Sequence, residues 1–457
     1  MRSRHGLVLA LALAGACSAP GADDRQAFVI DALTRDNQRW LDRDPAQVAA
    51  KYRIMAARTF DFFRGTAGLY WRDVTAAGAA ASASPFAADD GAWLWIVGDP
   101  HLENLGTRRR ADGSIYVDWN DYDAATRGPW WLDGRRLALG LMLGAEDAGL
   151  AAHGPRLVEL AAHAYAAELV RLADGGPVAL ERGGAVIADL CARAATAGDA
   201  GARLADYTRL DAAGRRTMFY GDVEPPAEDG TWIDTTVPVA GRERADVEAA
   251  VGDWRRGALV PAGALLGISR RLGAGVASYP APRYYALLGG ASDRADDDLL
   301  VELKEATAPV GMPPVPAALA LGLTEADRTV VAERTLAAAP DDDVLLGGAT
   351  VAPRSFRVRS RSGYERGVDL ADLADDAEGL DELAAAAGRA LARAHGRAPT
   401  VAGGAAAAVI APRLRGQADA LATAWQRDAE VDAARVRGDA ARFADALARD
   451  PLLGGAP

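Results

Sequence analysis

The chain has 457 residues, of which 50% are hydrophobic and 25% are charged, so it can bury a large core as one or two domains. Its formal net charge of −12 argues against nucleic acid as a partner and against attraction to an anionic membrane surface, because both repel a negatively charged protein.

Residues 1–17 have the features of an export signal. Arg2 and Arg4 supply a positive start, and the apolar run from Gly6 to Ala16 is too short to span a bilayer. Small residues then lead to Cys17, and this segment is similar to a bacterial lipoprotein cleavage box. We therefore expect an exported lipoprotein on the periplasmic side of the cell envelope, which meets the membrane only through a lipid on Cys17. Cleavage without lipidation and a buried apolar helix are the alternatives.

The next elements are helical and then extended. Helical periodicity runs from Asp24 to Tyr70. After a loop of small residues, Trp93–Val97 and Ile115–Val117 are rich in β-branched and aromatic residues, which predicts strands. The Asp112-Gly113 turn between them predicts that these two strands pair.

Oxygen donors are concentrated between and beyond these strands. They are Asp99, His101, Glu103, Asn104, Asp118, Asn120, Asp121 and Asp123. Carboxylates held this close repel one another unless a cation neutralises them. Mg²⁺ binds carboxylate and amide oxygens and takes further ligands from substrate phosphates. The stretch therefore predicts a magnesium site.

The spacing of these residues is typical of kinase-like phosphotransferases, in which an Asp, an Asn five residues later, a hairpin and a second Asp form the site. In that layout Asp99 orients and deprotonates the acceptor hydroxyl, while Asn104 and Asp118 hold Mg²⁺. Asp121 or Asp123 is the candidate ligand of a second ion. We expect His101 to fix the loop.

Two resemblances support this interpretation. Gly98-Asp99-Pro100-His101 with Asn104 resembles the aminoglycoside phosphotransferase type of small-molecule kinase. In that family a helix start similar to Pro129–Asp133 carries an Asp that braces the catalytic loop, and the resemblance implies this role for Asp133.

The longer motifs GDPHLENLG, DWNDYD, GPWWLDGRRLA and FFRG closely resemble the bacterial domain-of-unknown-function family 2252. Its further markers are Gly273–Ser278, Lys304-Glu305-Ala306 and Leu391–His395, so the resemblance extends from about residue 45 over most of the chain. The biochemistry of this family is poorly defined. The resemblance therefore implies that the chain is a member of the family but does not imply an activity.

Apolar, Ala-rich patterns predict several helices after Asp133 and an irregular insertion among them. The predicted helical segments are Leu137–Ala148, Pro155–Ala173, Gly184–Thr208 and Arg242–Arg256, and the insertion is Arg209–Gly241.

The second half opens with three predicted strands, Leu265–Leu272, Arg283–Leu288 and Leu299–Glu305. The turn Gly273–Ser278 joins the first two, and its Gly273, Gly275 and Ser278 are the candidate contacts to a nucleotide phosphate. The turn carries Val276 and Ser278 where the kinase pattern has Ser and Gly, so its backbone approaches a phosphate less freely.

Lys304 is one of only two lysines, with Lys51, against 49 arginines. A lysine kept inside an apolar strand indicates that a compact ammonium is needed, as for the phosphates of ATP or another nucleotide. The alternative is a strand-edge lysine that points to solvent. Glu333, in a predicted helix Glu325–Ala338, either pairs with Lys304 or faces solvent.

The remaining elements are a strand, Ser355–Arg359, and helices at Leu380–Arg397 and Gly403–Arg449. The helix with His395 resembles the one that precedes the catalytic loop in aminoglycoside-type kinases. The glycine turn, the lysine and this helix precede the catalytic Asp in kinases, whereas here they follow it.

We therefore predict an α+β, two-lobed, protein-kinase-like fold with circularly permuted motifs. Residues 24–256 form the catalytic-loop half of a large helical lobe, 260–365 a small β-rich lobe, and 366–457 helices that pack back on the large lobe. This order requires Lys304 to face the acidic pocket around Asp118.

The predicted function is Mg²⁺-dependent phosphoryl transfer from a nucleotide to a hydroxyl-type acceptor. Export, however, places the protein where ATP is scarce. Three interpretations stay open: another or locally supplied phosphodonor, a degenerate kinase fold that only binds a ligand, or a binuclear metallophosphoesterase. The last needs several further His ligands, and the chain has five His in all.

Overall fold

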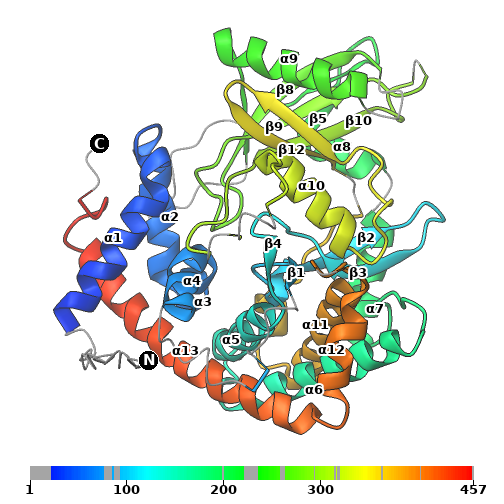
Figure 1. Ribbon diagram of the computed structural model, residues 1–457. Coiled ribbons are helices and arrows are strands. Elements are labelled where there is room, and N and C mark those ends of the chain that lie inside the picture. The colour runs from blue at the N-terminus through cyan, green and yellow to red at the C-terminus, as the bar shows by residue number, and fades with distance from the viewer. Residues whose placement is uncertain are drawn as a thin grey trace, which may run out of the picture.

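The computed structural model describes residues 22–76, 85–86, 93–197, 200–220, 235–257, 263–292, 294–312, 315, 320–361, 364–401 and 403–454. These residues form a helical region and a sheet region, which confirms the predicted α+β class (Figure 1). The predicted export signal and Cys17 lie outside the described residues. Of the helices described, none is both long and apolar enough to cross a membrane.

The helical region is built from both ends of the chain. Its members are α1 (Ala22–Leu41), α2 (Pro45–Ala57), α3 (Thr59–Gly65), α4 (Ala67–Thr75), α5 (Trp131–Asp147), α6 (Gly154–Ala173), α7 (Ala185–Ala197), α11 (Ala377–Arg397), α12 (Ala406–Leu414) and α13 (Ala418–Leu447). The C-terminal helices α11 and α13 pack on α5 and α6. In Figure 1 the blue α1 lies beside the red α13, and Arg25 of α1 donates to Asp439 of α13 at 3.0 Å.

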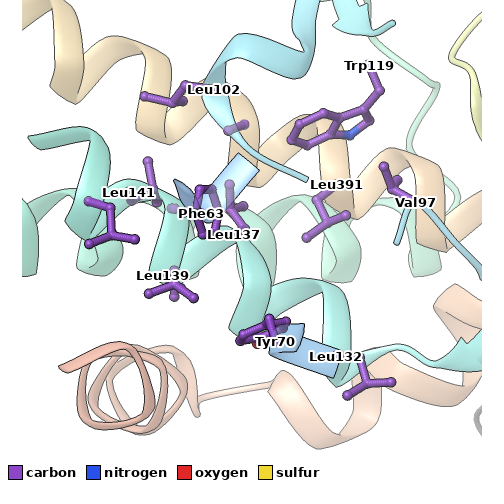
Figure 2. Close-up of a cluster of buried hydrophobic side chains, with 14 of the residues drawn as sticks. Phe63, Tyr70, Val97, Leu102, Trp119, Leu132, Leu137, Leu139, Leu141 and Leu391 are labelled. Atoms are coloured by element: carbon purple, nitrogen blue, oxygen red, sulfur yellow. The ribbon is translucent and has the colours of Figure 1, made fainter. Parts of the chain in front are cut away.

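Helix α5 runs through the centre of this region. Every side chain from Leu132 to Ala145 is buried, as expected of a helix that is covered on all sides. Figure 2 shows leucines of α5 packed with Phe63, Tyr70, Trp119 and Leu391, which come from three distant parts of the chain. The core therefore fixes the segments on both sides of Asp99 in one rigid body.

The sheet region contains one six-stranded antiparallel sheet in the order β11-β12-β10-β9-β8-β7. Its strands are β7 (Thr235–Pro238), β8 (Leu265–Leu272), β9 (Arg283–Leu288), β10 (Leu299–Glu305), β11 (Gly347–Val351) and β12 (Arg354–Ser360). Helix α9 (Gly241–Gly257) packs against this sheet through a separate apolar core. Helix α10 (Glu325–Leu336) contacts β11 and β12 as well as α11 and β1, so it joins the two regions. The three strands predicted first in the second half have the predicted bounds.

The predicted pairing of the first two strands was wrong. The strand β1 (Trp93–Ile96) pairs with β4 (Thr126–Pro129), and β3 (Ile115–Trp119) pairs with β2 (Leu105–Arg109), so the two predicted strands do not pair with each other. The short, arginine-ended β2 has no apolar alternation that would have marked it as the partner.

The predicted irregular insertion also contains regular structure. Helix α8 (Ala200–Tyr207) leads into a small hairpin of β5 (Thr208–Leu210) and β6 (Arg216–Met218), and β7 then forms an edge of the large sheet.

Candidate functional site

A cavity of about 560 Å³ lies where the helical region meets the sheet. This volume suits a small-molecule ligand. Asp99, Asn104 and Asp121 line it from the helical side, and Lys304 lines it from the sheet. A smaller cavity of about 150 Å³ shares all four of these side chains. The two cavities therefore meet at the predicted catalytic and metal-binding residues.

Asp99 follows a turn that only glycine can make. Gly98 has a φ of 85°, and a Cβ at this position would lie 2.1 Å from the carbonyl oxygen of Ala124. Asp99 Oδ1 then accepts a hydrogen bond of 2.8 Å from Arg136 Nε. The guanidinium of Arg136 is fully buried, donates to the carbonyl of Phe63 and stacks 3.7 Å from the Phe63 ring centroid. One carboxylate oxygen of Asp99 is thus held in place.

His101 lies behind Asp99 as a neutral ring. It is buried against Phe60 and Phe63, and burial lowers its pKa to about 3, although Asp99 acts in the opposite direction. Its Nε2 is 4.0 Å from Asp99 Oδ2, which is beyond hydrogen-bond distance. The position of His101 is consistent with fixing the loop by packing, and its low pKa makes it a poor proton acceptor.

Asp133 contacts the backbone just before Asp99. Its two oxygens accept hydrogen bonds from the amides of Val97 at 2.7 Å and Gly98 at 2.9 Å. His395 Nε2 lies 3.0 Å from the same carboxylate, and Tyr165 contacts the other ring nitrogen of His395. Asp133 is fully buried and does not line the cavity. Its geometry fits a residue that braces the loop.

Asn104 and Asp121 supply the oxygen atoms of the helical side. Asn104 Nδ2 donates to the backbone carbonyl of Asp99 at 2.9 Å, which leaves its side-chain oxygen available as an acceptor. Burial alone would raise the pKa of Asp121, but Lys304 and Arg357 outweigh it and hold this pKa below its ordinary value. Asp121 is therefore ionised at neutral pH.

Lys304 comes from β10, almost two hundred residues after this loop, yet its ammonium contacts the loop directly. The Lys304 Nζ atom is 3.4 Å from Asp121 Oδ2 and closer still to Asp123 Oδ2. The side chain is only 6% exposed, so the alternative of a solvent-pointing lysine is wrong. Arg357 Nη1 lies 3.5 Å from the other oxygen of Asp123. The lone strand lysine and the acidic loop thus converge in space.

The structure corrects the prediction for Asp118. This residue lies inside β3, is 1% exposed, and its carboxylate accepts a hydrogen bond of 2.7 Å from the backbone amide of Ala338. It lines neither cavity that holds Asp99. The apolar pattern placed the end of the strand at Val117, whereas β3 continues to Trp119. Asp121, just past that end, therefore occupies the position assigned to Asp118.

Neither alternative for Glu333 holds, because its carboxylate pairs with arginines and its side chain is buried. Glu333 lines the cavity, but its carboxylate accepts from Arg108 Nη2 at 2.9 Å and lies 3.8 Å from Arg357 Nη1. Asp121 and Asp123 compete successfully for the ammonium because they lie closer to it. Glu333 is ionised, since Arg108 and Arg357 outweigh the effect of burial and lower its pKa.

The glycine-rich turn covers the cavity only in part. Gly275 and Ser278 line it together with the two residues between them, whereas Gly273 does not. Both glycines have positive φ values, 76° for Gly273 and 78° for Gly275, so both are needed for the turn.

Lys51 of α2 holds this turn, and its role was missed. The Lys51 Nζ atom donates to the carbonyl of Ala277 at 3.0 Å and to the side-chain oxygen of Asn37 at 2.9 Å. Burial lowers the pKa of Lys51 to about 8. The scarcity of lysine, which drew attention to Lys304, applies equally to Lys51 and could have identified it. Arg136, in contrast, is one of 49 arginines and carried no such signal.

The oxygen atoms at the site are compatible with a Mg²⁺ ion that would be bound by the protein and by a phosphate ligand together. Asn104 and Asp121 offer hard oxygen atoms, and Mg²⁺ commonly takes one or two protein ligands with substrate phosphates. Among the described residues there is no group of three or more His, Cys, Asp or Glu arranged to hold a metal ion by themselves.

The fold and the site define an α+β protein with a charged ligand cavity between a helical region and an antiparallel sheet. Within that class, the chain belongs to the bacterial family described as "Uncharacterized protein conserved in bacteria (DUF2252)", whose family model matches residues 43–446. Comparisons with curated proteins and with solved structures give no match.

Proposed function

We propose that this protein is an exported phosphotransferase with a two-lobed, kinase-like fold whose motifs occur in rotated order. The observation that carries the proposal is the contact of Lys304 with Asp121 and Asp123 inside the cavity that also holds Asp99 and Asn104. A buried ammonium beside carboxylates, with room left for a ligand, is an arrangement suited to phosphate transfer.

The roles follow from the contacts. Asp99 has one oxygen fixed by Arg136 and the other free to accept the proton of an acceptor hydroxyl. The acceptor oxygen then bonds to the terminal phosphorus, the bond from that phosphorus to its bridging oxygen breaks, and the shortened donor leaves with that electron pair. Lys304 and the turn Gly275–Ser278 hold the donor phosphates. Asn104 and Asp121 would hold Mg²⁺, which neutralises the charge on the phosphate oxygens when bound.

We place the acceptor in the smaller cavity. Donor and acceptor must approach Asp99 from different sides, and the smaller cavity reaches Asp99 from the side of α1, α2 and α4. Its lining combines Trp40 and Trp71 with Asp36 and Arg39. Such a surface suits an acceptor with an apolar body and several polar groups.

A second candidate is a ligand-binding protein of the cell envelope that transfers nothing. The observation that favours it is that Lys304 contacts two carboxylates, because an ammonium already paired with two carboxylates attracts a phosphate less strongly. Val276 in the glycine-rich turn acts in the same direction. Turnover separates the two candidates, since only the first forms a phosphorylated product.

A thermal-shift screen with ATP and inorganic phosphodonors, each with and without Mg²⁺, tests the proposal. We expect a Mg²⁺-dependent rise in Tm for at least one donor, which Lys304→Met abolishes. Arg354→Met is the matched control, because Arg354 is a partly buried cation on the neighbouring strand β12 that lines neither cavity. An equal shift in Lys304→Met, or no shift with any donor, would overturn the proposal. A shift without product would leave the ligand-binding candidate.

A further inference from the structure

The sheet side of the larger cavity carries a cationic strip. In the sheet register Lys304 stands opposite Arg283 of β9 and Arg357 of β12, so three cations form one row. Arg359 stands opposite Glu302 in the next row, and Arg361 follows at the end of β12. From Lys304 to the level of Arg361 the strip extends over four residues of β10, or about 13 Å.

The carboxylates near this strip are shared among several cations, except that Arg361 has its own partner in Glu365. Glu302 is fully buried, and four guanidinium groups lie within 4 Å of it: Arg359 at 3.2 Å, Arg283 at 3.5 Å, Arg357 at 3.8 Å and Arg271 at 3.9 Å. The described residues that line the cavity include nine cationic side chains and six carboxylates, in a protein whose net charge is −12. The positive charge is therefore concentrated locally, at the cavity.

Some buried guanidinium atoms have no hydrogen-bond partner among the described residues. They include Nε and Nη1 of Arg357, a residue that is 2% exposed, and Nε of Arg361. The carboxylate oxygen nearest to Arg357 Nη1 is that of Asp123, at 3.5 Å. Arginine cannot lose its charge at accessible pH, and a buried N–H donor without an acceptor is costly even where the group has an ion-pair partner. An anionic ligand in the cavity would supply the missing acceptors.

A nucleobase does not fit this lining. Base pockets are mostly apolar, yet among the described residues the only aliphatic and phenolic side chains on the cavity wall are Val276, Ala277 and Tyr364. The first two belong to the glycine-rich turn, at the Lys304 end. One face of the Tyr364 ring is covered by the guanidinium of Arg109, 4.5 Å from its centroid. The part of the cavity beyond Lys304 is thus built for charge.

We infer that the phosphodonor is a condensed phosphate chain, held at one end by Lys304 and along its length by Arg283, Arg357, Arg359 and Arg361. This inference rests on the proposed function and narrows its donor: a nucleoside triphosphate, whose base would lie on the arginines, is the poorer ligand. Arginine is the residue best suited to repeated phosphate contacts, because its planar group offers several donors in a fixed geometry.

Calorimetric titration of the purified protein with inorganic tripolyphosphate, ATP and inorganic phosphate, each with Mg²⁺, tests the inference. We expect tripolyphosphate to bind at least tenfold more tightly than ATP and phosphate. Arg361→Gln should weaken tripolyphosphate binding at least tenfold and leave ATP binding within threefold. Arg437→Gln is the matched control, because it removes the same charge from α13, where Arg437 pairs with Glu146 outside the cavity.

The outcomes are distinguishable. ATP binding as tight as tripolyphosphate binding, with Arg361→Gln without effect, would overturn the condensed-phosphate donor and leave the phosphotransferase proposal intact. Tripolyphosphate binding that is lost equally in Arg437→Gln would show attraction to net charge and would also overturn it. Absence of binding by all three ligands would overturn both.

Discussion

Arg136 Nε donates to Asp99 Oδ1 at 2.8 Å from a guanidinium that has no exposed surface. The pair connects the centre of α5 to the loop that carries the proposed proton acceptor. Arg136 touches neither cavity, so we regard it as a positioning residue for Asp99.

Arg136→Met should destabilise the protein by about 3 kcal/mol, because removal of one partner of a buried ion pair leaves the other charge uncompensated. Urea unfolding measures this change. Arg58→Met is the control, since Arg58 is 46% exposed and its ion pairs contribute about 1 kcal/mol or less. If the phosphotransferase proposal holds, Arg136→Met also lowers kcat more than it raises KM, whereas a purely structural role would lower only the amount of folded protein.

Asp121→Asn should abolish Mg²⁺-dependent phosphate binding, whereas Asp118→Asn should retain it. Asp121 lines the cavity as an ionised carboxylate, and Asp118 is buried beneath it with an amide as its partner. Asn at 118 can still accept that hydrogen bond, so this control should fold. Calorimetric titration with Mg²⁺ and the donor gives the comparison. Loss of binding in Asp118→Asn with retention in Asp121→Asn would restore the assignment made from sequence.

The buried His101 should make stability fall in acid. Its pKa is about 3 in the folded protein against 6.5 for a free side chain, so between these values the unfolded chain binds a proton that the folded chain does not. Stability therefore decreases as pH falls from about 6.5, by up to about 1.4 kcal/mol per pH unit. His101→Phe should flatten this acid decline of the unfolding free energy. Parallel pH profiles for the two proteins would contradict the argument.

Lys51 should affect stability in the alkaline range of pH. Burial lowers its pKa to about 8 from 10.5, so between pH 8 and 10.5 the unfolded chain binds more protons and the contribution of Lys51 to stability rises with pH. The stability difference between the wild type and Lys51→Met, measured by urea unfolding at pH 8 and pH 10, should shift in favour of the wild type by 1 kcal/mol or more. A constant difference would show that Lys51 does not titrate in this range.

The parts of the molecule that sequence could predict are those whose signal is local. The bounds of β8, β9 and β10 follow from short runs rich in leucine and tyrosine that turn-forming residues separate, and Lys304 stands out because lysine is scarce. Long-range pairing has no local signal in the sequence. No local pattern indicates that β1 pairs with β4, or that Arg136 rather than any other arginine contacts Asp99. The exchange of Asp118 for Asp121 came from an error of two residues in the end of β3, because Asp118 was expected to follow the strand and instead lies inside it.

The hydrogen bond between Arg25 and Asp439 joins residues 414 positions apart. Because α1 packs against α13 as well as against α2 and α4, part of its packing surface stays uncovered until almost the whole chain has been made. The helical region therefore cannot close while the chain is still emerging, and its apolar faces stay exposed during that time. Long-range closure of this kind slows folding, so we expect newly made chains to depend on protection from aggregation until their last helix is available.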